Sequence, residues 1–169
     1  MEKRKSFLNQ KGFSLVELII VIAIMAILVA VMVPVLMKWI EKSNVSSDTQ
    51  LADTVRGAFL CAVTDARVLA DSKSDPYFAL MEDGSGSIQD PVKGMEITQL
   101  TSADCVMRES VEEILGMHVW EVKKHLKSKH ETDSEFWVLL KGGNVIVTVT
   151  HTDSSGKKVT NANRDIVVD

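Results

Sequence analysis

The sequence lacks the short motifs on which most catalytic sites are built. It has no nucleophile elbow, no phosphate-binding loop and no paired-carboxylate motif. Its histidines do not stand at the spacing of zinc ligands; they are His118, His125, His130 and His151. We therefore expect a protein that is not an enzyme and that binds neither a metal nor a cofactor.

Cysteine and proline are scarce, with two cysteines and three prolines among 169 residues. No cluster of glycine and proline interrupts residues 37–69, so a helix can continue through them. Cys61 and Cys105 could form a disulfide, which the chain-entropy model credits with about 4 kcal/mol. The alternative is two separate, partly buried thiols.

Basic residues are not in excess, because the net charge is −4. Residues 1–12 alone carry a net charge of +3, and without them the charge of the chain is −7. Nucleic-acid binding requires basic surface, so the acidic balance argues against it. One basic group does occur, and a solvated face explains it better than contact with DNA; it comprises Lys123, Lys124, Lys127 and Lys129 with His125 and His130.

Charge is almost absent from residues 13–37, where Glu17 is the only charged side chain. As a helix, these 25 residues would be about 37 Å long, against a membrane hydrocarbon core of about 30 Å. The basic residues just before this segment predict an N-terminus in the cytoplasm and a C-terminal domain outside. We expect a single pass through the inner or cytoplasmic membrane.

Helical periodicity continues after this segment. Apolar residues recur on one helix face at three- or four-residue spacing: Leu51, Val55, Phe59, Ala62, Ala66 and Leu69. We predict one long helix over roughly residues 13–70, whose first half lies in lipid and whose second half packs on a domain. Pro34 removes a backbone donor within it and predicts a kink or local loosening.

The first part of the remaining chain combines a loop and a helix. Residues 71–94 are rich in glycine, proline and serine and are predicted to form a loop region that can contain short structured pieces. A second helix is expected near residues 103–116, with Thr101 or Ser102 at its start and Gly116 at its end.

The end of the chain has the pattern of β-strands. An apolar run at Phe136–Leu140 is followed by a turn signal at residues 142–144 and by alternating residues over Val145–Thr150. Further short strands are expected at Lys157–Thr160 and Ile166–Val168. The predicted fold class is α+β: a long helix packed on a small antiparallel sheet of three or four strands.

The stretch Lys-Gly-Phe-Ser-Leu-Val-Glu-Leu-Ile, residues 11–19, is the most informative in the chain. A secretory signal would have a shorter apolar core followed by a small-x-small cleavage site. A plain membrane anchor fits the length but leaves Glu17 unexplained. A carboxylate within an apolar membrane helix costs about 3 kcal/mol on insertion scales and is normally paired or functional.

This stretch and the apolar helix after it resemble the N-terminal signal of type IV prepilins and type II secretion pseudopilins. The resemblance implies that prepilin peptidase cuts between Gly12 and Phe13 and methylates the new amine of Phe13. It also implies that Glu17 and Pro34 serve assembly through the helix. The implied segments are a leader at 1–12, a transmembrane and assembly helix at 13–37, its amphipathic continuation at 38–70 and a pilin-like head at 71–169.

The function implied by the resemblance is that of a structural subunit of a pilus-like filament. Its partners would be prepilin peptidase, copies of itself and other pilins, and the membrane with its assembly platform. After assembly the subunit would lie in a cell-surface or periplasmic filament. Three alternatives stay open: a type II secretion pseudopilin, a competence pilin that contacts DNA, and a membrane-anchored binding module that never polymerises. The last requires neither Glu17 nor the junction between Gly12 and Phe13.

Overall fold

The computed structural model describes residues 13–82, 94–128, 134–152, 158–159 and 166–169. The chain divides into two compact units, one ending at Ile40 and one beginning at Glu41. Helix α1, Leu15–Thr64, begins in the first unit and ends in the second. In the first unit, every described side chain from residue 13 to residue 40 is exposed. The helix continues through Pro34, and the kink predicted there stays a prediction.

The end of α1 differs from the sequence prediction. The helix ends at Thr64, and Asp65 adopts an extended backbone before the short helix α2, Ala66–Leu69. The Asp65 carboxylate accepts a hydrogen bond from the backbone N–H of Arg67 at 2.8 Å, which caps α2. One continuous helix to residue 70 was therefore wrong. Because the break turns the chain, Leu69 is 61% exposed, although periodicity had placed it on the buried face.

The region predicted as a loop with short structured pieces contains a short helix, and two further short elements follow it. Helix α3, Asp75–Met81, has Pro76 in its first turn, at a position where the missing N–H costs no helical hydrogen bond. Strand β1, Met95–Glu96, and the 3₁₀ helix η1, Ile97–Leu100, follow Gly94. Gly94 has φ +129°, and a Cβ there would lie 2.6 Å from the carbonyl oxygen of Val138. Glycine therefore allows β1 to approach the sheet.

Helix α4, Val106–Leu115, confirms the second predicted helix, and Gly116 ends it with a left-handed φ of 67°. The predicted N-cap, Thr101 or Ser102, was wrong, because Cys105 is the N-cap residue and provides no side-chain hydrogen bond. The first N–H groups are satisfied instead from a distant segment. The Asp71 carboxylate accepts a hydrogen bond from the backbone N–H of Val106 at 2.9 Å. Ser74 Oγ accepts one from the backbone N–H of Met107 at 3.3 Å.

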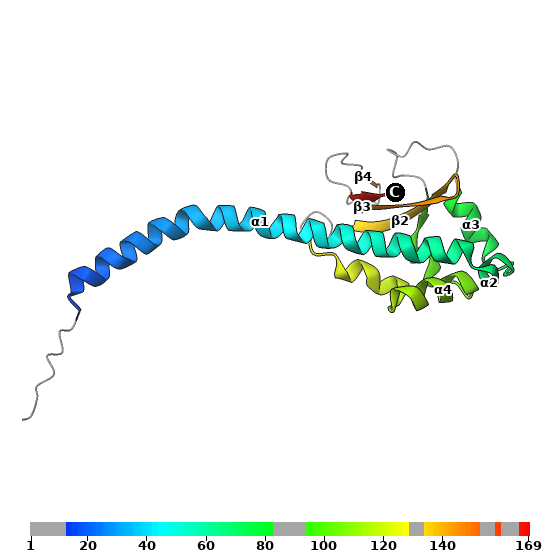
Figure 1. Cartoon of the computed structure of the whole chain (residues 1–169), viewed down its shortest axis with the longest axis horizontal. Helices are drawn as coiled ribbons and strands as arrows, with labels where there is room; N and C mark the ends of the chain where they lie inside the picture. The colour runs from blue at the N-terminus through cyan, green and yellow to red at the C-terminus, as the bar shows by residue number, and fades with distance from the viewer. Residues whose placement is uncertain (1–12, 83–93, 129–133, 153–157, 160–165) are drawn as a thin grey trace, which may run out of the picture. The chain divides into compact units, whose positions relative to one another are not determined.

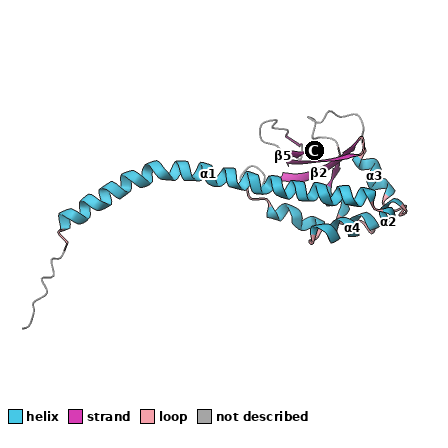
Figure 2. Ribbon diagram, in the orientation of Figure 1, coloured by secondary structure: helices cyan, strands magenta, loops and turns pink. Residues whose placement is uncertain are grey.

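Within the described ranges, the sheet is antiparallel and has five strands, one more than the largest number expected. Its order is β1-β2-β3-β4, and β5 also pairs with β3. Residues Gly142 and Gly143 connect β2 to β3 with φ values of 59° and 83°, which suits the two-residue turn of a tight hairpin. The strands beyond β1 are β2 at Ser134–Lys141, β3 at Asn144–Thr152, β4 at Lys158–Val159 and β5 at Ile166–Val168 (Figure 2). The predicted turn at residues 153–156 lies outside the described residues.

One hydrophobic core holds the second unit together. In Figure 1 the second half of α1 runs between the sheet and α4. The buried α1 side chains of this core are Ala52, Val55, Ala58, Phe59 and Ala62, and they cluster with Val111 of α4 and with Phe136, Val138, Val145 and Val147 of the sheet. Arg56 of α1 also donates from Nε to the carbonyl oxygen of Val145 at 3.0 Å.

A buried carboxylate joins α1 to the segment after the 3₁₀ helix η2, Val119–His125. Asp48 is 0% exposed. Its Oδ1 accepts from the backbone N–H of Lys127 at 2.9 Å, and its Oδ2 accepts from that of Ser128 at 2.8 Å. Two N–H donors thus satisfy the negative charge in place of a cation.

Candidate functional site

The acidic residue of the N-terminal stretch has a partner within its own chain. Ser14 directly precedes α1, and its backbone N–H donates to Glu17 Oε2 at 2.8 Å. This contact is one half of a capping box, in which an acid at the third helical position binds the N–H of the capping residue. The Ser14 N–H was not predicted from the sequence as a partner of Glu17, although the Ser-x-x-Glu spacing is the signal of a capping box. Glu17 therefore stabilises the start of its own helix.

The residue on the far side of Ser14 is Phe13, whose side chain is 91% exposed. Gly12 lies outside the described residues, so the cut after it and the methylation of Phe13 stay predictions. If the cut occurs, the new amine lies one residue from the N–H that Glu17 accepts. The structure thus brings Glu17 next to the chain position at which a positive charge would form.

Helix α1 contains a segment apolar and long enough to cross a membrane. Large apolar side chains from Leu15 to Ile40 are about half exposed or more, and none of them belongs to the cluster of buried core residues. Three alanines, Ala23, Ala26 and Ala30, are interspersed among them. Small residues of this kind allow close approach of a second helix in lipid.

Comparison with known proteins agrees with this arrangement. Residues 8–33 match the family model of the prokaryotic N-terminal methylation motif. The chain is 38% identical over 80 residues to the type IV narrow pilus major component PilA5 of Thermus thermophilus, a match that covers 47% of this chain and 67% of that protein. The chain belongs to the type IV pilin family. This pilin is also 41% identical over 64 residues to a fimbrial protein of Moraxella nonliquefaciens, covering 38% of this chain but only 42% of the relative. No solved structure gives a significant match.

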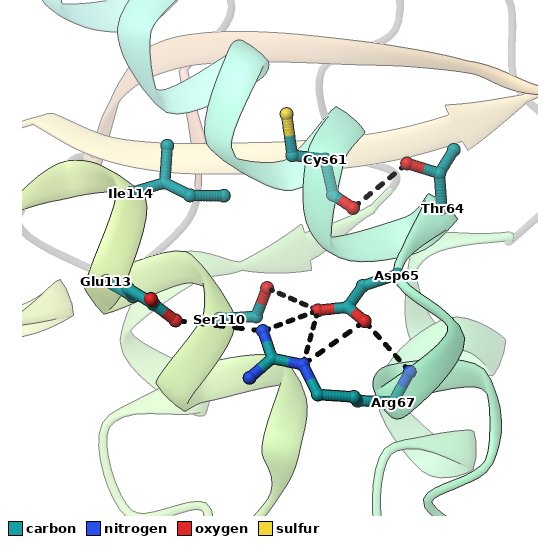
Figure 3. A pocket seen from close by; sticks show the side chains of 7 residues that line it. All are labelled: Cys61, Thr64, Asp65, Arg67, Ser110, Glu113 and Ile114. Carbon is teal, nitrogen blue, oxygen red and sulfur yellow. Dashed lines mark hydrogen bonds and ion pairs between the residues drawn. The ribbon is translucent and has the colours of Figure 1, made fainter.

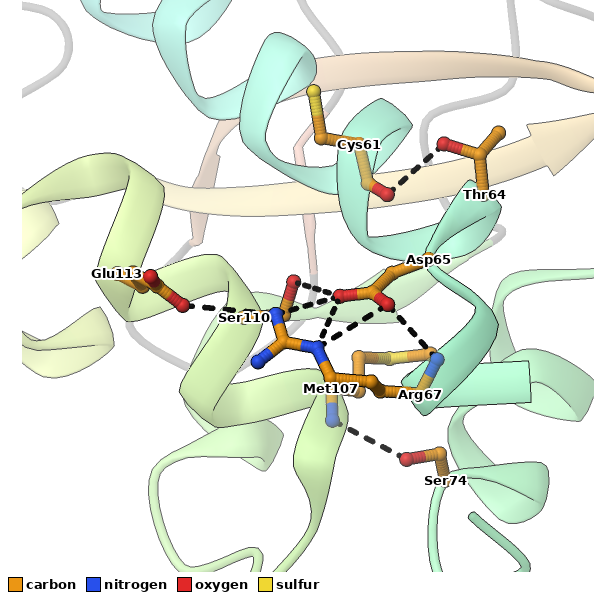
Figure 4. Close-up of polar contacts among 8 residues, drawn as sticks. All are labelled: Cys61, Thr64, Asp65, Arg67, Ser74, Met107, Ser110 and Glu113. Carbon is orange, nitrogen blue, oxygen red and sulfur yellow. Dashed lines mark hydrogen bonds and ion pairs between the residues drawn. The ribbon is translucent and has the colours of Figure 1, made fainter. Parts of the chain in front are cut away.

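The head of this pilin carries a shallow cavity of about 520 Å³ between the end of α1 and α4 (Figure 3). Its lining residues are Cys61, Thr64, Asp65, Arg67, Ser110, Glu113 and Ile114. The guanidinium of Arg67 binds Asp65 with Nη2 at 2.8 Å from Oδ2, and it lies 3.7 Å from Glu113 Oε2 (Figure 4). Ser110 Oγ lies 3.5 Å from the same Asp65 carboxylate.

The electrostatics of this cavity favour a structural role. Hydrogen bonds from the Arg67 side chain and backbone lower the pKa of Asp65, and the same carboxylate raises the pKa of Arg67. Two carboxylates thus face one guanidinium, which leaves no net positive charge to hold an anion. This group of Asp65, Arg67 and Glu113 was not predicted from the sequence. The available signal was Asp65 followed by helix-forming residues, which is the pattern of a helix cap.

The structure keeps the two cysteines of the pilin as free thiols. Cys61 is exposed, and its side chain points away from the Asp65–Arg67 pair (Figure 3), whereas Cys105 is buried at the start of α4. This arrangement differs from a Cys61–Cys105 disulfide and from the partial burial expected for both thiols. Intact-mass measurement with alkylation, before and after reduction, distinguishes the bonded from the free state in the isolated protein.

The basic group is only partly available for contact with other molecules. Lys123 forms an ion pair with Glu135 of β2, and the Lys124 ammonium lies 3.9 Å from the centre of the Trp120 ring. Lys127 is exposed, while Lys129 and His130 lie outside the described residues. Within the described ranges, no three metal-ligating side chains form a group that could hold a metal ion.

Proposed function

We propose that this pilin is a structural subunit of a type IV pilus-like filament, cut between Gly12 and Phe13, methylated at Phe13 and polymerised through the first half of α1. The observation that carries the proposal is the position of Glu17. It is the only charged side chain among residues 13–37, and it is held at the helix start beside Phe13. The motif match over residues 8–33 supports the processing steps.

Assembly supplies Glu17 with a second partner. A carboxylate has about four lone-pair directions, so Glu17 can keep its bond to the Ser14 N–H and also accept from a neighbour's Phe13 amine. That amine has a reference pKa of about 7.7–8 and is largely protonated at neutral pH. Two unit charges 4 Å apart attract by about 4 kcal/mol at an effective dielectric of 20, before desolvation is subtracted. A wrong axial register would leave both charges unpaired in lipid, so the pair selects the register.

The remaining features fit the same sequence of events. Before assembly the protein would span the inner membrane once with its N-terminus in the cytoplasm, and afterwards it would lie in a surface or periplasmic filament. Prepilin peptidase, other pilin copies and the assembly platform would be its partners. Pro34 would provide a point at which α1 loosens when the subunit leaves the bilayer. No cofactor and no enzymatic step is part of this function.

The alternatives differ in what they require. A type II secretion pseudopilin would use the same motif and the same pairing, in a shorter filament. A competence pilin would need several cations for DNA, but Lys123 is paired with Glu135, which leaves Lys124 and Lys127 as the other exposed lysines of the described part of the basic group. A membrane-anchored module would gain by replacing Glu17 with an apolar residue. A filament subunit therefore accounts for Glu17 and for the motif match over residues 8–33.

The test is N-terminal sequencing and mass of protein sheared from the surface of the producing cells. We expect a chain that begins at methylated Phe13 and is found in filaments. An uncut chain confined to membranes would contradict the proposal. Two variants separate the roles of Glu17: Glu17→Gln keeps an oxygen for the Ser14 N–H but removes the charge, whereas Glu17→Ala removes both. Both should be cut and inserted, and neither should assemble. Normal assembly of Glu17→Gln would show that capping, and not charge pairing, is what the residue provides.

A further inference from the structure

Two outward cations lie at the end of η2 and just beyond it. Lys124 and Lys127 are both exposed, and we call them the basic segment. The backbone N–H of Lys127 is held by Asp48 at 2.9 Å, and the Lys124 ammonium is positioned over the Trp120 ring. These contacts fix the segment on the head, and among the described residues no carboxylate forms an ion pair with either ammonium. The basic segment is therefore a defined positive surface on a chain that is acidic overall.

Helix α4 presents a negative surface made of two exposed glutamates: Glu109 lies in the first turn, where the helix dipole favours an acid, and Glu113 lies near the other end. Glu109 and Glu113, called here the acidic face, stand four residues apart, so their like charges lie one turn from each other and repel. Glu113 also lies in the last turn of α4, where the helix dipole favours cations, and that turn holds no basic residue. By contrast, Glu112 accepts from the Val119 N–H at 3.1 Å and has a function within the chain.

Glu113 receives little compensation from its neighbours. Its side chain is 73% exposed, and Arg67 lies 3.7 Å away while binding Asp65 at 2.8 Å. Local arrangements that oppose the helix rules in this way are characteristic of functional surfaces. A cation supplied from outside the subunit would relieve both the repulsion within the acidic face and the unfavourable position of Glu113.

The anchors of the two surfaces lie far apart along α1 within one chain. The acidic face is anchored near the end of α1, where Ser110 lies 3.5 Å from Asp65, and the basic segment is anchored at Asp48. From Asp48 to Thr64, α1 rises by about 24 Å. The positive and negative surfaces are thus anchored at two different positions along α1, although neither surface is part of α1.

We propose that the basic segment of one subunit docks on the acidic face of a second copy of this chain. The proposal rests on the filament function above, because parallel copies in a filament share one helix direction. Contact between surfaces at two levels then requires the contacting copies to be displaced along α1 by about 24 Å. The contact also offsets repulsion between chains that each carry a net charge of −7 once residues 1–12 are removed.

The first test uses sheared wild-type filaments treated with a zero-length carbodiimide, which joins carboxylates to amines. Peptide mass spectrometry should find Glu109 or Glu113 joined to Lys124 or Lys127, and a dimer band should appear on denaturing gels. The same treatment of monomers dispersed in detergent is the control. Because the anchors are about 24 Å apart within one chain, the link of Glu109 to Lys127 should be absent there. Wild-type filaments without these links would overturn the proposal.

The second test is a charge exchange. Glu109→Lys with Glu113→Lys, or Lys124→Glu with Lys127→Glu, should each lower the yield of sheared filaments by about tenfold or more, and combining all four should restore most of it. The control Asp53→Lys with Glu82→Lys makes the same charge change at exposed positions elsewhere and should assemble normally. Cut protein in the membrane and tryptophan fluorescence show that each variant folds.

The outcomes separate the two proposals. If wild-type protein is absent from the sheared fraction, the filament function itself fails. If wild-type filaments form but either exchange assembles normally, or the combined exchange is no better than each half, only the docking contact is overturned. If the lysine exchange assembles normally and its filaments no longer retain added double-stranded DNA, the basic segment serves nucleic acid and the docking proposal fails.

Discussion

The buried carboxylate of Asp48 provides the sharpest test of how the head is held on α1. Asp48→Asn keeps the shape of the side chain, so it opens no cavity. The amide has only one oxygen, so it can accept from Lys127 or from Ser128 but not from both. Its NH₂ group would then face a buried backbone N–H, and the one remaining bond would lose its charge assistance.

The magnitude follows from the two hydrogen bonds, at 2.9 and 2.8 Å. A bond to a charged group contributes about 1.5–3 kcal/mol, and a neutral one about 1 kcal/mol. Losing one bond and weakening the other should lower the free energy of unfolding by about 3 kcal/mol. The opposing term is the cost of burying a charge, which asparagine removes. Because both oxygens are bonded at short distance, we expect the lost bonds to dominate.

The assay is urea unfolding of the cut chain in detergent, followed by tryptophan fluorescence in a Trp39→Phe background, so that the signal comes from Trp120 and Trp137 of the head. The control is Asp53→Asn, whose side chain is 65% exposed and lies 3.8 Å from Arg56. It should change the free energy of unfolding by no more than about 0.5 kcal/mol. A loss below about 1 kcal/mol for Asp48→Asn, with an unchanged urea dependence, would refute the reasoning.

Two further predictions use the same unfolding assay. Gly94→Ala should destabilise the head by roughly 1–3 kcal/mol, because its φ of 129° is strained for alanine and the new Cβ would meet the Val138 carbonyl oxygen. The control Gly57→Ala places a Cβ in open space within a helix and should stabilise the protein by up to about 1 kcal/mol. Equal effects of the two substitutions would contradict the conformational argument. The hydrogen bond from the Val106 N–H lowers the pKa of Asp71. The ionised Asp71 carboxylate therefore contributes to the stability of the head above about pH 4, and this contribution is lost as the pH falls through the lowered pKa. Asp71→Asn should therefore weaken the loss of stability between about pH 5 and pH 2; an acid dependence equal to that of wild type would show that Asp71 does not carry it.

Periodicity and composition were sufficient for the parts of the fold that depend on local rules. The apolar segment before residue 40, helix α4 with Gly116 at its end, and the hairpin through Gly142 and Gly143 were all predicted, because backbone preference and alternation of apolar residues act within a few positions of the chain. Strand β1 was not predicted. Two residues carry no measurable alternation, and only their pairing with β2 makes them a strand.

The sequence alone determined the family resemblance and the importance of Glu17, since an isolated charge in an apolar segment is visible without coordinates. Tertiary structure decided what the other polar residues of the head do. Asp48 and Asp71 appear in the sequence as ordinary surface acids, yet each binds backbone N–H groups of a segment far along the chain. Such contacts depend on where folding brings two segments together, and no local pattern records that position. For the same reason, the separation of the acidic face from the basic segment along α1 could be inferred only from the contacts that anchor each of them.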